Sequence, residues 1–172
     1  MNFVQATLDG DGKLKATIGA GGQKTLMDQQ RWVDVFNAAG LPAAVEHDMP
    51  LWLRCHVPLC VAFESVSVAG VRRGGGASWG EALVLARGIH ASFGLIKGLG
   101  YPVYPRAKKM IDRAPASVVA AMLWSMSRVR SFRELLATGK AECVALVNAM
   151  VAAAPFAKGP VVVPDIQAMK PS

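Results

Sequence analysis

The most apolar stretch of the chain is residues 48–69, and the other elements are expected to pack around it. Between residues 51 and 63 the only charged or strongly polar side chains are Arg54 and His56. A segment that is apolar on all sides predicts a helix that runs through a core rather than along its surface. Asp48 is a good N-cap for it. The organisation of the fold therefore depends on this helix, and Arg54 needs either a partner or a solvent-filled cleft.

Apolar residues recur at helical spacing through most of the chain. The residues Ser78 and Glu81 fit a capping box, and Ser131 fits an N-cap. The tail after Pro160 is expected to be extended and apolar enough to pack on a neighbouring molecule. Besides the central helix, the pattern predicts helices over residues 28–39, 78–99, 105–113, 115–127, 131–137 and 141–153.

The front of the chain has a different pattern. Residues 3–8 and 13–18 are short runs of strand formers on either side of an Asp-Gly-Asp-Gly turn, which predicts a β-hairpin. The glycine-rich residues 19–22 lack the spacing of a phosphate-binding loop, so a plain connector is favoured. The predicted fold class is mainly α, with a β-hairpin and glycine loop at residues 1–24 and a multi-helix domain at 25–172.

Composition excludes several classes of protein. The net charge is +7, but the basic residues are scattered along the sequence without interleaved aromatics, which argues against nucleic acid. The chain is 52% hydrophobic, yet its longest apolar run, residues 57–63, is far below the ~18 residues of a membrane span. Three cysteines without a CxxC motif, and an N-terminus unlike a signal peptide, favour a reducing compartment and hence the cytoplasm.

Candidate chemistry is sparse. The three histidines are too far apart for a metal motif, and no metal site is expected. Four polar residues stand on otherwise apolar helices and suggest an anionic-ligand cleft: Arg54, His56, Ser131 and Glu142. Two alternatives stay open, namely an ion pair of Arg54 with Glu142 and a hydrogen-bonded core histidine at His56. A basic glycine loop at residues 70–76 is a further, weaker candidate for anion binding.

Several of these motifs also occur in a known family. In order and spacing they resemble the C-terminal helical domain of ketopantoate reductases (2-dehydropantoate 2-reductases), which is similar to that of 6-phosphogluconate dehydrogenase. The resemblance covers residues 15–170. The residues that carry it are 40–42, 48–56, 100–105, 132–139 and 141–146.

The resemblance implies an NADPH-dependent enzyme in which a Rossmann domain binds the cofactor and the helical domain completes the cleft for a small 2-keto acid. In the family a lysine donates a proton, and a serine and a glutamate bind the substrate. These roles carry over only in part, because the lysine position holds Arg54 and a family asparagine corresponds to Pro58. The glutamate matches Glu142, the serine lies at or next to Ser131, and His56 is a further candidate for substrate binding.

The chain leaves no room for the nucleotide-binding βαβ unit of such a Rossmann domain, so it is interpreted as the C-terminal part of a reductase. We expect it to bind no cofactor and to be inactive alone, with NADPH needed only by a full-length relative. Family members commonly pair through this domain, so a homodimer is also expected. The alternative function is a non-catalytic helical module for homodimerisation or interaction.

Overall fold

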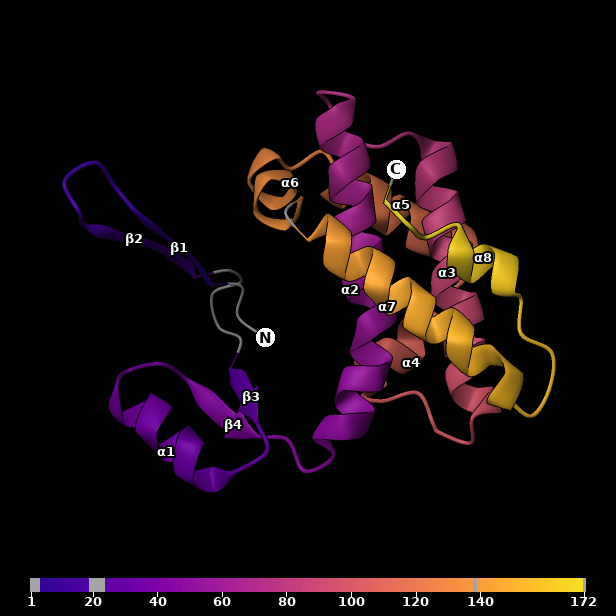
Figure 1. The fold of residues 1–172 in the computed structure, drawn as a ribbon, viewed down its shortest axis with the longest axis horizontal. Coiled ribbons are helices and arrows are strands. Elements are labelled where there is room, and N and C mark those ends of the chain that lie inside the picture. Colours follow the sequence, from indigo (N-terminus) through magenta and orange to yellow (C-terminus); the bar gives the residue numbers. More distant parts are fainter. Residues whose placement is uncertain (1–3, 19–23, 138, 172) are drawn as a thin grey trace. The chain divides into compact units, whose positions relative to one another are not determined.

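The computed structural model describes residues 4–18, 24–137 and 139–171. Two compact units divide the chain, Met1–Pro50 and Leu51–Ser172, and each is described by itself (Figure 1). Helices dominate, which confirms the predicted class of a mainly α protein with a short β-hairpin at the front. The glycine-rich residues 19–22 lie outside the described residues.

The first unit opens with the predicted hairpin. Strands β1 (Val4–Leu8) and β2 (Leu14–Ile18) pair antiparallel. Asp9 organises the turn between them, because its Oδ1 accepts hydrogen bonds from the backbone N–H groups of Asp11 and Lys13 at 3.1 and 2.8 Å. Gly12 follows with φ of 74°, which glycine adopts at little cost. The Asp-Gly-Asp-Gly sequence therefore acts through turn chemistry.

A small βαβ unit follows, which the sequence analysis missed. Strands β3 (Thr25–Met27) and β4 (Ala43–Val45) pair in parallel and are linked by helix α1 (Gln30–Ala38). Strands of three residues are too short to show an alternating pattern. The helix predicted over residues 28–39 is present as α1, and it belongs to this first unit. Only Asp28 and Gln29 join β3 to α1, without a glycine.

The second unit is built around helix α2 (Met49–Arg72), which continues through Pro58. Twelve of its 24 residues are buried, and Cys55, Val61 and Val66 are fully buried, whereas Leu53 and Arg54 are exposed. By length and composition α2 could cross a bilayer, but 56% of its most apolar window is buried inside the structure. The core helix of a soluble protein passes the same test.

Helix α3 (Trp79–Gly98) packs against helices from later in the chain. Its partners are α5 (Ala116–Met126) and α8 (Val163–Gln167), while α7 (Lys140–Ala153) lies across the front of α2 in Figure 1. The side chains of Ile89, Phe93 and Leu123 are fully buried at the centre of this packing. The remaining elements are the short helices α4 (Arg106–Arg113) and α6 (Arg130–Leu136) and the 3-10 turn η1 (Ala154–Phe156).

Two predictions from the sequence are wrong, one on the start of a helix and one on the tail. Helix α6 begins at Arg130 with Val129 as N-cap, so Ser131 lies inside the first turn and is exposed. The tail is not simply extended, because it forms α8 and then buries Met169 completely. Met169 packs directly over Gly88 of α3, where a Cβ would collide with its side chain. The apolar tail is therefore covered within its own unit.

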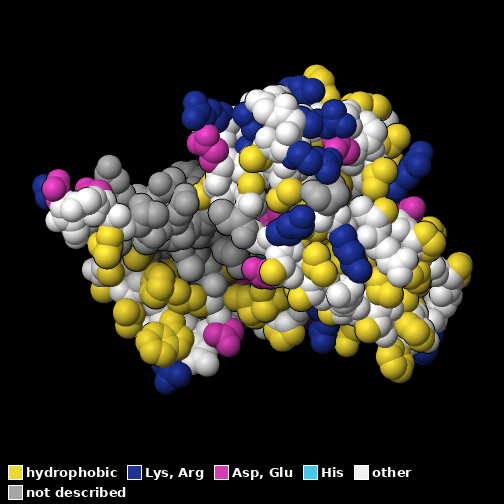
Figure 2. Space-filling view, turned by 45° about the horizontal axis from the view of Figure 1, so that its top comes forward, with side chains coloured by type: hydrophobic (Ala, Val, Ile, Leu, Met, Phe, Trp, Pro, Cys, Tyr) yellow, Lys and Arg dark blue, Asp and Glu magenta, His cyan; other side chains and the backbone are white. Residues whose placement is uncertain are grey.

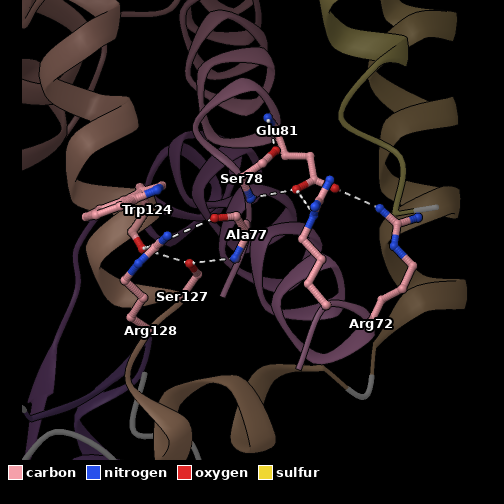
Figure 3. Close-up of polar contacts among 8 residues, drawn as sticks. Arg72, Ala77, Ser78, Glu81, Trp124, Ser127 and Arg128 are labelled. Carbon is pink, nitrogen blue, oxygen red and sulfur yellow. Dashed lines mark hydrogen bonds and ion pairs between the residues drawn. The ribbon is translucent and has the colours of Figure 1, made fainter. Parts of the chain in front are cut away.

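A carboxylate joins the end of α2 to the start of α3. Glu81 accepts hydrogen bonds from Arg72 at 2.7 Å, from Arg73 at 2.8 Å and from the N–H of Ser78 at 2.7 Å, which Figure 3 shows with the capping box that the sequence predicts. Burial alone raises the pKa of Glu81, but the hydrogen bonds from Ser78 and Arg73 outweigh it and lower this pKa to about 2. Arg72 and Arg73 therefore form ion pairs with Glu81 of α3.

The same loop is tied to the end of α5. Ser127 Oγ accepts a hydrogen bond from the N–H of Ala77 at 3.0 Å and donates one to the carbonyl of Trp124 at 2.7 Å. Arg128 lies over the Trp124 ring at 3.3 Å from its centroid and donates to the carbonyls of Trp124 and Ala77 at 2.8 and 3.3 Å (Figure 3). These bonds fix the connection between α2 and α3.

Candidate functional site

Arg54 projects from the first half of α2 to the surface of the second unit. Its guanidinium carbon lies 4.4 Å from the centroid of the Tyr101 ring. Among the described residues Arg54 forms no ion pair, so the alternative of an ion pair with Glu142 is wrong. Glu142 is exposed in the first turn of α7. Stacking on an aromatic ring holds the guanidinium but leaves its in-plane N–H groups able to bind an anion.

Arg54 stands at the rim of a pocket of about 340 Å³. Helices α2, α3 and α7 form its walls, and the side chains are almost all apolar. A volume of this size lies at the lower end of the range for small-molecule sites. Besides Arg54 and Tyr101, the lining consists of Val57, Ser92, Leu95, Ile96, Leu99, Leu146, Ala149, Met150 and Ala153.

His56 faces a different side of α2 from Arg54. Residues two apart in a helix are rotated by about 200°, so their side chains diverge. The His56 ring packs on Trp52, with ring centroids 4.4 Å apart. His56 is not among the residues that line the Arg54 pocket. The structure therefore separates two residues that the sequence analysis placed in one cleft.

Lys108 of α4 occupies the Trp52 side of the helix, and the sequence analysis gave it no role. Its side chain is buried, with only 6% of its surface exposed. Its Nζ donates to the carbonyl oxygen of Trp52 at 2.8 Å and lies 4.1 Å from the centroid of the Trp52 ring. Lys108 and Trp52 are 56 residues apart in sequence, so no local pattern could have indicated this contact.

His56 is not the hydrogen-bonded core histidine that was one of the alternatives. Its Nε2 is buried and has no hydrogen-bond partner among the described residues. Burial, and then the positive charge of Lys108, lower the pKa of His56 from its usual 6.5 to about 4. The imidazole is therefore neutral near pH 7. A neutral ring outside the pocket lining adds no positive charge to the Arg54 site.

Glu142 and Ser131 lie outside the Arg54 pocket as well. Glu142 is one helical turn before Leu146, so it belongs to the α7 face that continues into the pocket wall. Ser131 is on α6, where the next residue, Phe132, packs edge-on against Phe63 of α2. Phe63 is about 13 Å further along the axis of α2 than Arg54. Of the four predicted site residues, Arg54 alone is in the lining of this pocket.

The cysteines behave as core residues. Cys143 Sγ donates to Glu64 Oε2 at 3.1 Å. Burial, then the hydrogen bond to Glu64, raise the pKa of the Cys143 thiol. Burial, then the charges of Glu64 and Glu142, raise the pKa of Cys60 to about 11. Both thiols stay protonated near neutral pH and are poor nucleophiles.

The arginines that are scattered in sequence gather in space around the C-terminal end of α2. Arg133 lies against Gly70, and Arg128 lies against Gly76. Figure 2 shows Lys and Arg side chains gathered near the top of this unit, among apolar ones. All five arginines of this group have a partner within the chain. Arg72 and Arg73 bind Glu81, and Arg130 binds Glu134. Arg128 and Arg133 donate hydrogen bonds to backbone carbonyls.

The described residues offer little to a metal or a dinucleotide. They contain no group of three or more His, Cys, Asp or Glu side chains that could hold a metal ion. The strand-to-helix turn of the βαβ unit, Asp28 and Gln29, lacks the glycines that bring a backbone close to a pyrophosphate. These residues do not fit NADPH, and no step of a hydride transfer is assigned to them.

The chain matches no protein-family model, no curated protein and no solved structure. The resemblance to ketopantoate reductases therefore rests on the sequence motifs alone.

Proposed function

We propose that this chain is the substrate-binding and dimerisation domain of a ketopantoate-reductase-like, NADP-dependent oxidoreductase, and that it binds the carboxylate of a small 2-keto acid through Arg54. The observation that carries the proposal is the guanidinium of Arg54, which lies over the Tyr101 ring at the rim of an apolar pocket without a carboxylate partner among the described residues. The ordered motifs support the choice of substrate class.

Arg54 has the chemistry of a binding residue and not of a proton donor. A guanidinium forms two parallel hydrogen bonds to a carboxylate, which fixes the orientation of the acid. It holds its own protons too tightly to act as a general acid near neutral pH. The domain therefore binds and orients a keto acid, and it is not active alone.

Calorimetric titration of 2-keto acids into the purified chain tests this proposal. We expect Arg54→Met to weaken binding by about 10- to 100-fold, because hydrogen bonds to a charged group contribute about 1.5–3 kcal/mol. Arg54→Lys should give an intermediate loss, since lysine keeps the charge without the planar fork.

The matched control is Arg31→Met. Arg31 is an exposed arginine of the first unit that also lies over an aromatic ring, at 5.0 Å from the centroid of Trp32. This variant should bind like the wild type. Equal binding by wild type and Arg54→Met would refute the proposal, and so would tight, saturable binding of NADPH to the chain, which would mean that a nucleotide site exists in it.

A second candidate function, a homodimerisation module without catalysis, is favoured by the surface of α5. This helix contains no charged residue, and Val118 is 57% exposed on its outer side. A charge-free face lets two copies of a chain with net charge +7 approach without direct repulsion at the contact. Sedimentation velocity should show a dimer that Val118→Glu dissociates, and a strict monomer at all concentrations would refute this function.

A further inference from the structure

We infer that the Arg54 pocket selects acids with an apolar, unhydroxylated body, such as straight-chain aliphatic or aromatic 2-oxo acids, over a hydroxylated acid such as ketopantoate. The inference rests on the proposed function for the acidic head group. It goes beyond that function in naming which part of the ligand the pocket recognises.

The walls of the pocket offer almost no hydrogen-bonding partner. Besides Arg54 and Tyr101 at the rim, Ser92 is the polar side chain in the lining. Its hydroxyl donates to the carbonyl of Gly88 at 2.7 Å, and Ser92 has 0% of its surface exposed. It therefore presents no accessible oxygen or hydrogen to a ligand. A hydroxyl carried into this pocket would lose its water without a replacement, which is unfavourable.

The apolar walls come from three helices. Leu95 and Ile96 of α3, with its C-cap Leu99, line the pocket together with Leu146 and Met150 of α7 and Val57 of α2. Side chains of this type stabilise a bound methylene group by removing it from water, and each buried methylene contributes about a fourfold gain in affinity. Met150 adds an adaptable thioether that tolerates ligands of different shape.

The size and the charge of the site fit one another. A pocket of about 340 Å³ lies at the lower end of the range for small-molecule sites, so it fits a small acid rather than a large ligand. Arg54 is exposed at the rim and Tyr101 is 38% exposed, so a carboxylate would stay partly hydrated there while the chain enters the pocket. The single positive charge at the rim therefore sets the orientation.

Calorimetric titration with two matched sets of acids tests the inference on the full chain. The first set is pyruvate, 2-oxopentanoate and 2-oxooctanoate, which differ only in methylene number. The second pairs ketopantoate with 3,3-dimethyl-2-oxopentanoate, in which a methyl group replaces the hydroxyl. We expect affinity to rise about three- to fourfold per methylene, and the methyl analogue to bind about tenfold more tightly than ketopantoate.

Two variants of α7 distinguish the effect of filling the pocket from the effect of changing the helix elsewhere. Ala149 lines the pocket and Ala152 does not, and both are exposed positions that tolerate a larger side chain. Ala149→Phe should fill the pocket and make the affinities of the three straight-chain acids nearly equal. Ala152→Phe should leave the series unchanged. An equal effect of both variants would overturn the inference.

The remaining outcomes distinguish the inference from the proposed function. Arg54-dependent binding with no dependence on chain length, or tighter binding of ketopantoate than of its methyl analogue, would overturn the inference and leave the proposed function intact. Octanoate serves as the acid without a keto group. If octanoate binds as tightly as 2-oxooctanoate, the apolar-body inference holds and the keto-acid function fails. Absence of binding by every acid overturns both.

Discussion

Helix α2 takes part in two contacts between a cation and an aromatic ring, and the two cations differ in their exposure and in their other partners. On one side Arg54 lies over Tyr101, exposed at the rim of a pocket. On the other side Lys108 lies over Trp52 and is 6% exposed. Lys108 also donates to a backbone carbonyl, whereas Arg54 has no ion pair among the described residues.

The comparison shows how burial decides the role of a charged side chain. A buried ammonium must be compensated within the protein, and Lys108 obtains this from the ring and the carbonyl of Trp52. Its charge then acts on the neighbouring His56 and helps to keep the imidazole neutral. An exposed guanidinium needs no such compensation, so Arg54 can bind an external anion. This comparison predicts a structural role for Lys108, and it supports the proposed role of Arg54 in recognition.

The largest expected effect is that of Lys108→Ala on stability. This change removes a desolvated cation–ring contact and the packing of the lysine stem, and it should lower the free energy of unfolding by about 2–3 kcal/mol. Urea denaturation followed by circular dichroism measures this loss. Lys109→Ala is the control, because Lys109 is the next residue of α4 and is exposed. Equal losses for the two variants would contradict a structural role for Lys108.

The next effect concerns His56 and pH. The pKa of His56 is about 4 in the folded chain and 6.5 in the unfolded chain, so between these values the unfolded state binds a proton that the folded state does not. Stability therefore falls as the pH drops from 6.5 toward 4, and this group alone should cost about 2 kcal/mol between pH 7 and pH 5.

Two variants test the origin of this pH dependence. His56→Phe keeps a ring against Trp52 without a titrating group, so it should remove the loss between pH 7 and pH 5 in urea denaturation. Lys108→Met removes the second cause of the shift, and it should raise the pKa of His56 as followed by NMR titration of the ring. An unchanged pH dependence in His56→Phe would show that other groups are responsible.

Much of the fold follows from local signals in the sequence. The capping box at Ser78 and Glu81 forms as predicted, and Gly40 and Gly100 end their helices with φ of 75° and 88°. Such features act over a few residues, and so the helices and the hairpin could be predicted. The parallel pairing of β3 with β4 depends on contacts between segments 18 residues apart, and strands of three residues carry no pattern of their own.

The candidate site could be predicted less well, for a geometric reason. Arg54 was singled out because a charge in an apolar helix needs an explanation, and it does line a pocket. The same reasoning selected His56, although a separation of two residues places it on another side of the helix. Tyr101 and Lys108 reach α2 from 47 and 56 residues away, and only the packed structure brings them there.

A smaller effect is expected from Tyr101→Leu. Leucine preserves an apolar wall but removes the ring on which the Arg54 guanidinium lies at 4.4 Å. The arginine would then lose its preferred orientation, and keto-acid binding should weaken by about two- to fivefold, in line with ~0.5–1 kcal/mol for an exposed cation–ring contact. Tyr101→Phe keeps the ring and should bind like the wild type in the same titration. A full loss of binding in Tyr101→Phe would mean that the hydroxyl group contacts the ligand.

The smallest effect, and the sharpest test of the comparison, is that of Arg54→Met on stability. The side chain is exposed, its contact with Tyr101 is open to solvent, and methionine keeps a similar stem, so the free energy of unfolding should change by less than about 1 kcal/mol. The same variant should lose most of its keto-acid binding. Urea denaturation and calorimetric titration on one preparation separate the two readouts. A loss of stability as large as that of Lys108→Ala would show that Arg54 serves the fold, and the distinction between the two sides of α2 would disappear.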